Sequence, residues 1–123
     1  MQVKILRQRD YLVVSIQSAL TDADLLRLRD DLVEQVGRFR SLGVIVDVTA
    51  LDVLDSYAVR TLSSLGKVIK LHGAETVIVG IQPEVAFAMM QMGLSLAEVA
   101  TARDLADGLL HLDRNIVRGA DGT

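Results

Sequence analysis

Short apolar runs divide the chain into segments that have the length and composition of β-strands. They cover residues 3–6, 11–16, 44–48, 76–81 and, more weakly, 97–99. The runs at 44–48 and 76–81 are almost continuously aliphatic, which is typical of strands buried on both faces of a parallel sheet. Only the charged residues 7–10 separate the first two runs, so we expect an N-terminal hairpin there. The last run, Ala97 to Val99, predicts a short edge strand.

Between these runs, apolar residues recur every three or four positions, which is the spacing of one face of an α-helix. The members of the four predicted faces are Leu25, Leu28, Leu32, Val36 and Phe39; Val59, Leu62, Gly66 and Ile69; Val85, Met89 and Met92; and Leu105, Leu109, Leu112 and Ile116. Capping signals predict where helices begin and end. The predicted starts are the pairs Thr21/Asp24 and Thr101/Asp104 and, for the third helix, Pro83; the predicted ends are Gly43, Gly73 and Gly93.

The order of the elements is β-β-α-β-α-β-α-β-α, which predicts a single α/β domain with right-handed crossovers. Its sheet is expected to be mostly parallel, with an antiparallel N-terminal edge strand and about four helices. We expect the domain to cover residues 3–117 and residues 118–123 to form a flexible tail. Functional residues of such folds gather at the carboxyl ends of the strands, which directs attention to the turns after Val48 and Ile81.

Composition and charge exclude several classes of protein. The chain has 123 residues, 50% of them hydrophobic, and no cysteine, so disulfides, thiol nucleophiles and thiolate metal sites are absent. The net charge is −3, so the composition does not suggest a basic surface that would bind nucleic acid. No apolar segment approaches the ~20 residues of a membrane helix, and no signal peptide is visible at the start, so we expect a cytoplasmic protein that does not bind a membrane. His72 and His111 have no partner at metal-ligand spacing, and no cofactor fingerprint is present.

The most informative segment follows the third predicted strand and leads into the second predicted helix. It contains the carboxylates Asp47, Asp52 and Asp55 and the hydroxyl of Ser56 within ten residues. Ser56 falls at the cap or first turn of the helix, where free backbone N–H groups and the positive end of the helix dipole favour an anion such as phosphate. On local sequence alone, an ordinary helix cap is the favoured interpretation of Asp55 and Ser56.

The element order, residues 46–49 at a strand end and Asp55-Ser56 at the next helix start resemble the STAS domain family, which includes the bacterial anti-sigma-factor antagonists. The likeness covers roughly residues 3–116. Within the family, the chain is most similar to the small stressosome scaffold proteins of the RsbS type. The stretches that carry this likeness are 12–17, 55–57 and Gly80-Ile81-Gln82-Pro83.

The resemblance implies a non-enzymatic scaffold whose serine at the position of Ser56 is phosphorylated by a switch-type serine/threonine kinase. The unphosphorylated scaffold would hold that kinase in a large cytoplasmic assembly with larger STAS-containing co-scaffold paralogues, and phosphorylation would release it. A phosphatase would reset the site. We expect Asp47, Asp52, Asp55 and Tyr57 to help form the partner-binding surface, and we expect no cofactor and no metal.

Other functions remain open from the sequence. Many direct antagonists of anti-sigma factors have glycine two residues after the phosphorylated serine, where this chain has Ala58, so a soluble antagonist is the second interpretation. A phosphoacceptor of the response-regulator type would need an acidic pair at the end of the strand 11–16 and a lysine beyond a late strand, and this chain has neither. A small enzyme using the three carboxylates needs a pocket that separates their pKa values. Met89, Met90, Met92 and Phe87 fit either core packing or a partly exposed contact patch.

Overall fold

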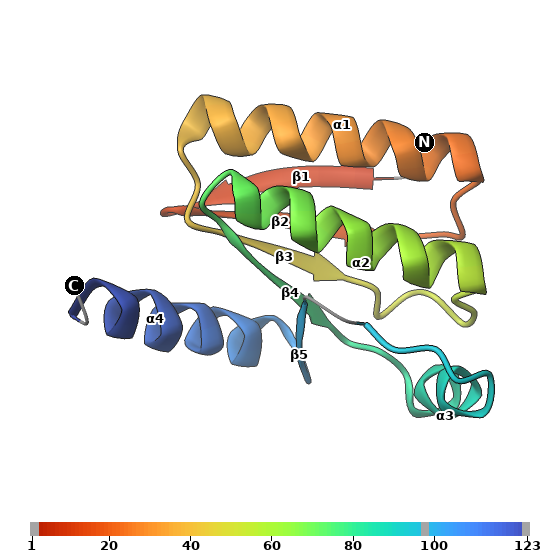
Figure 1. Ribbon diagram of the computed structural model, residues 1–123. Helices are drawn as coiled ribbons and strands as arrows, with labels where there is room; N and C mark the ends of the chain where they lie inside the picture. Colours follow the sequence, from red (N-terminus) through yellow and green to blue (C-terminus); the bar gives the residue numbers. More distant parts are fainter. Residues whose placement is uncertain (1–2, 97–98, 122–123) are drawn as a thin grey trace.

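Five strands form one mixed sheet in the order β1-β2-β3-β4-β5 (Figure 1). The computed structural model describes residues 3–96 and 99–121. The strands are β1 (Val3–Gln8), β2 (Tyr11–Ile16), β3 (Gly43–Asp47), β4 (Glu75–Val79) and β5 (Ala100–Ala102). β1 pairs with β2 in antiparallel orientation, and all other neighbours are parallel. The predicted α/β class, the N-terminal hairpin and the mostly parallel sheet are therefore confirmed.

Two separate cores lie on opposite faces of this sheet. The helices are α1 (Asp22–Phe39), α2 (Ser56–Leu71), α3 (Pro83–Gln91) and α4 (Leu105–Asp121). Alternate residues of β2 point to opposite faces, so Leu12 and Val14 join the core under α1 and α2, whereas Tyr11 joins the core under α4. α3 stands apart from the α1–α2 layer, beyond the carboxyl ends of β3 and β4 (Figure 1). This end of the sheet therefore carries the turns that the fold class marks for function.

A tyrosine ties α4 to the second strand. The Tyr11 hydroxyl donates to Asp113 Oδ1 at 2.5 Å, and Arg9 lies 3.5 Å from the other oxygen of the same carboxylate. Burial, together with the hydrogen bond and the negative charge of Asp113, raises the pKa of Tyr11 to about 12. Tyr11 is therefore neutral at all ordinary pH values and acts as a hydrogen-bond donor.

Three boundary predictions need correction. α1 ends before Gly43, because Arg40 already takes the left-handed conformation, with φ of 49°. Gly43 instead opens β3, where a Cβ would lie 2.8 Å from a methyl carbon of Leu112. The final strand does not include Val99: β5 is Ala100–Ala102, and residues 97–98 of the predicted strand lie outside the described residues. Thr101 belongs to that strand, so it does not cap α4; Asp104 accepts from Asp107 N at 2.8 Å instead.

The other helix ends follow the sequence signals. Thr21 and Asp24 form both hydrogen bonds of a capping box at the start of α1, and Pro83 is the first residue of α3. α4 includes residues 118–121 of the predicted tail. The domain limit at residue 117 and the mobility of the tail stay predictions. No helix formed by the described residues has the length and apolar character needed to cross a membrane.

Candidate functional site

Ser56 is the first residue of α2, as the sequence predicted. Asp55 is the N-cap, and its Oδ1 accepts from Ala58 N at 2.8 Å. Ser56 is half-buried, at the junction of the β3–α2 turn and the helix. The positive end of the α2 dipole therefore lies at this hydroxyl, which gives an anion there a stabilising electrostatic environment.

Asp47 shapes the turn that leads to Ser56. It is the last residue of β3, and its Oδ1 accepts from Thr49 N at 2.9 Å and from Thr49 Oγ1 at 2.6 Å. Short aspartate side chains commonly fold the following backbone in this way. The observed role of Asp47 is therefore local, and its predicted contact with a partner stays a prediction.

A bridge from the β4–α3 turn holds the β3–α2 turn in place. Gln82 Nε2 donates to Thr49 O at 2.8 Å and lies 3.4 Å from Asp52 Oδ1. Gly80 has φ of +80°, and a Cβ on it would lie 1.9 Å from Thr49 Oγ1. The two turns are thus interlocked, so that the segment before Ser56 and the start of α3 form one unit.

Thr49, Gly80 and Gln82 were not among the site residues predicted from sequence. The stretch Gly80-Ile81-Gln82-Pro83 did stand out as a family likeness, but nothing local links it to residues 49–52. The link arises because β3 and β4 pair in parallel, with Asp47 opposite Val79. Both turns then leave the sheet side by side.

A groove of about 340 Å³ runs between the segment before α2 and the side of α3. Its lining residues are Asp52, Val53, Leu54, Asp55, Ser56, Glu84, Val85, Ala88 and Met92. The structure therefore brings together Ser56 and two of the predicted partner-binding carboxylates, Asp52 and Asp55. Asp47 and Tyr57 are not among the lining residues, although Tyr57 is half-buried beside Ser56. Glu84 was not predicted, and its position in the first turn of α3 was its only sequence signal.

The methionines of α3 divide between the two interpretations that the sequence left open. Met89 is buried, whereas Met90 and Met92 are exposed, as is Phe87. α3 buries only Val85 and Met89 among its residues. One side of α3 thus packs on the domain, and the other side presents apolar side chains to solvent.

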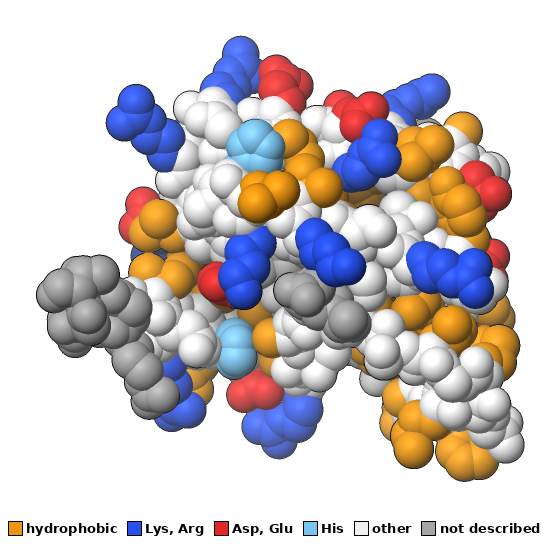
Figure 2. Space-filling model, in the orientation of Figure 1, with side chains coloured by type: hydrophobic (Ala, Val, Ile, Leu, Met, Phe, Trp, Pro, Cys, Tyr) orange, Lys and Arg blue, Asp and Glu red, His pale blue; other side chains and the backbone are white. Residues whose placement is uncertain are grey.

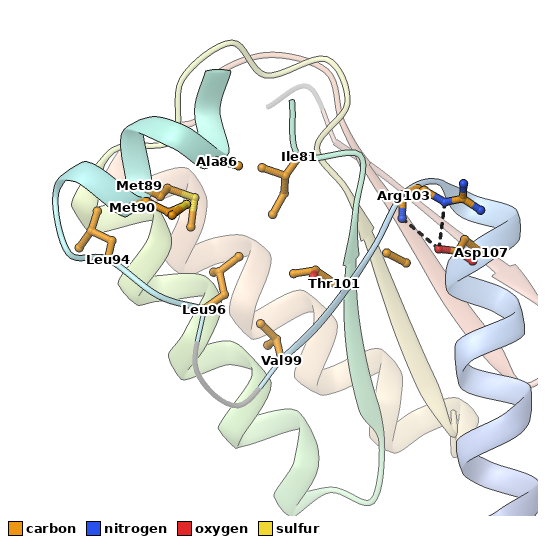
Figure 3. Close-up of a pocket in the computed structure, with 11 residues that line it drawn as sticks. Ile81, Ala86, Met89, Met90, Leu94, Leu96, Val99, Thr101, Arg103 and Asp107 are labelled. Atoms are coloured by element: carbon orange, nitrogen blue, oxygen red, sulfur yellow. Dashed lines mark hydrogen bonds and ion pairs between the residues drawn. The ribbon is translucent and has the colours of Figure 1, made fainter. Parts of the chain in front are cut away.

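A wider pocket of about 730 Å³ lies on the β5 side of α3. Figure 3 shows Ile81, Leu96 and Val99 directed into it, with Met89 along the α3 wall. The polar members of its lining are Thr101, Arg103 and Asp107, and the Arg103 guanidinium lies 3.7 Å from Asp107 Oδ2. Since this cation and this anion compensate each other, the pocket offers no net charge to a ligand. Among the described residues, no group of three His, Asp or Glu side chains is arranged to hold a metal ion.

The solved structures that match include two that are more than 30% identical and extend over nearly the whole of both chains. One is RsbS from Moorella thermoacetica in a form in which a serine is replaced by glutamate: it is 33% identical, with a TM-score of 0.79, over 96% of this chain and 99% of that one. The other comes from the molecular architecture of the stressosome, a signal integration and transduction hub: it is 34% identical, with a TM-score of 0.75, over 94% and 99% of the two chains.

A curated relative matches only in part. The RsbT co-antagonist protein RsbRA of Bacillus subtilis is 29% identical over 83 residues, which cover 68% of this chain but only 30% of that protein. The family model of the STAS domain matches residues 2–107, which include the whole sheet and the first three helices. The expected family is thereby confirmed, and the chain belongs to the STAS domain family.

Proposed function

We propose that this protein is a non-enzymatic scaffold of a bacterial stressosome-type signalling complex, which retains a serine/threonine switch kinase until Ser56 is phosphorylated. The observation that carries the proposal is that Ser56 lies at the first position of α2 and lines an open groove at the functional end of the sheet. The similarity to RsbS over nearly all of both chains supports the scaffold role.

The groove suggests how phosphorylation acts. A phosphate adds about −1.5 to −2 charges and three acceptor oxygens, and the N-terminus of α2 stabilises such a group. The phosphate would occupy the groove between Asp52, Asp55 and Glu84 and keep its water. A partner that packs against the neutral serine then has to displace a hydrated dianion, which weakens the complex.

The remaining components follow from the same proposal. Larger STAS-containing paralogues share the assembly, a phosphatase resets Ser56, and the complex is cytoplasmic. The sequence similarity to RsbRA, a co-antagonist protein with a matching segment, supports the paralogue component. Asp52, Asp55 and Tyr57 contact the kinase around Ser56, and Asp47 acts through the shape of the turn.

The test is to incubate the full chain with ATP and the switch kinase and to map the added mass. We expect one phosphoryl group on Ser56, none in Ser56→Ala, and normal modification in Ser64→Ala, whose serine is exposed further along α2. Ser56→Ala should retain the kinase, and Ser56→Asp should retain it at least about tenfold more weakly. A phosphoryl group elsewhere, or none from an active kinase, contradicts the proposal. A one-to-one complex with an anti-sigma factor instead identifies a direct antagonist.

A further inference from the structure

Large apolar side chains are exposed in the segment before α2 and on α3, which form the two walls of the Ser56 groove; of these side chains, Val53 and Met92 line the groove. Val53 before α2 is 69% exposed, and on α3 Phe87 is 61%, Met90 77% and Met92 55% exposed. Figure 2 shows hydrophobic side chains gathered over the α3 end of the molecule, at lower right. Exposed apolar groups that cluster in this way mark surfaces for protein contacts, and methionine adapts readily to different partners.

These side chains do not contribute to the core of their own domain. α3 is held to the domain by Val85 and Met89, of which Val85 also lines the Ser56 groove and Met89 the wide pocket. The methionines, in particular, adjoin hollows: Met92 lines the Ser56 groove and Met90 the wide pocket. The apolar area of α3 therefore remains available to another protein.

The charged side chains that line the Ser56 groove are all acidic. The exposed carboxylates Asp52, Asp55 and Glu84 line the groove. No lysine or arginine occurs anywhere in residues 41–59 or 71–102, the segments that build the functional end of the sheet. The first basic residue after Ser56 in the chain is Arg60, about one turn further along α2, and it is not among the residues that line the groove.

We infer that the partner that binds the Ser56 end presents a cationic, amphipathic surface: an apolar side chain enters the groove, and flanking lysine or arginine residues pair with Asp52, Asp55 and Glu84. The inference rests on the proposed function, in which this partner is the switch kinase. Opposite charges across an interface accelerate association and set its orientation, while buried apolar anchors supply most of the affinity.

This partner chemistry determines how the switch operates. A phosphate on Ser56 has the same sign as the surface around it, so it does not repel a cationic partner. Release therefore comes from occupation of the groove, where the phosphate and its water take the place of the apolar anchor. Salt and phosphorylation should then act independently, because salt screens the rim and phosphate blocks the centre.

The test measures the affinity of the full-length chain for the switch kinase, from about 0.05 to 0.5 M salt. We expect high salt to weaken binding and Glu84→Lys to weaken it about tenfold. Glu34→Lys, the same charge change on the exposed side of α1, should stay within about twofold of the native chain. We expect Met92→Gln, a change at a 55% exposed side chain that lines the groove, to weaken binding about fivefold. Leu71→Gln, a change of an 87% exposed side chain at the far end of α2, should not weaken it.

Each outcome separates this inference from the proposed function. If Glu84→Lys and Met92→Gln bind like their controls while phosphorylation of Ser56 still releases the kinase, the inference of a cationic partner is wrong and the proposed switch stands. If the kinase neither binds nor phosphorylates the chain, both fail. If the chain alone self-associates and Glu84→Lys abolishes that association, a second copy occupies the surface and the inference is overturned.

Discussion

Replacing Gly80 by alanine should disturb the interlocked turns without touching Ser56. Gly80 has φ of +80°, a conformation that costs an alanine about 1 kcal/mol. The new methyl group would lie 1.9 Å from Thr49 Oγ1, 3.0 Å from its Cβ and 3.2 Å from its Cα. Thr49 must therefore move, and backbone as well as side chain must give way.

The displacement of Thr49 adds a second cost. Its hydroxyl donates to Asp47 at 2.6 Å, and a hydrogen bond to a charged group contributes about 1.5–3 kcal/mol. The backbone strain and the lost hydrogen bond together should lower the free energy of unfolding of Gly80→Ala by about 3 kcal/mol, which lowers the Tm of a domain of this size by about 12 °C. Because Thr49 O also accepts from Gln82, α3 should loosen together with the turn before Ser56.

Gly73→Ala is the matched control. Gly73 has φ of +89°, but a Cβ there meets nothing within 4 Å, so the substitution incurs only the backbone strain of about 1 kcal/mol. Thermal unfolding followed by circular dichroism should place Gly80→Ala about 8 °C below Gly73→Ala. Adding Thr49→Ala should recover part of the loss. Equal melting temperatures for the two glycine variants would refute the argument that the turns collide.

Two further predictions concern the cap beside Ser56 and the tie between β2 and α4. Asp55→Ala removes the acceptor of the hydrogen bond from Ala58 N and should lower the free energy of unfolding by about 1 kcal/mol. Asp55→Asn retains an acceptor and should lose less than half of that free energy. Equal losses for the two variants in urea unfolding would contradict the role of Asp55 as a helix cap. The folded-state pKa of Tyr11, about 12, lies above its ordinary value of 10.0, so the neutral hydroxyl stabilises the fold below pH 10 and this contribution disappears as pH rises to 12. Urea unfolding between pH 10 and pH 12 should show this extra loss of unfolding free energy in the native chain and not in Tyr11→Phe. If the unfolding free energies of the two chains fall in parallel with pH, the stabilising role of the Tyr11 hydroxyl is excluded.

Most elements could be predicted because their signals are local. The runs that became β2, β3 and β4 are apolar over five or six residues, and each contributes residues to both cores. The capping box of α1 needs only the spacing from Thr21 to Asp24. The position of Ser56 at the start of α2 follows in the same way, because an aspartate before a helix is a strong start signal.

The boundaries that failed depend on contacts with distant residues. Nothing near Gly43 reveals that Leu112, on the last helix, will lie against it, so the glycine resembled a helix end. β5 is only three residues long and is defined by its pairing with β4. A strand of that length has too little apolar pattern of its own to be located from sequence.

The order of the elements, the fold class and the position of Ser56 at a helix start can all be inferred from the sequence, since each depends on spacings of a few residues. The surroundings of that serine, in contrast, arise from contacts between distant residues in the folded chain. Gln82 reaches Thr49 across 33 residues, and the exposed end of α3 supplies Glu84 and the apolar rim. The physical reason is the parallel pairing of β3 and β4, which places the β3–α2 turn beside the β4–α3 turn, although α2 lies between these two turns in the chain.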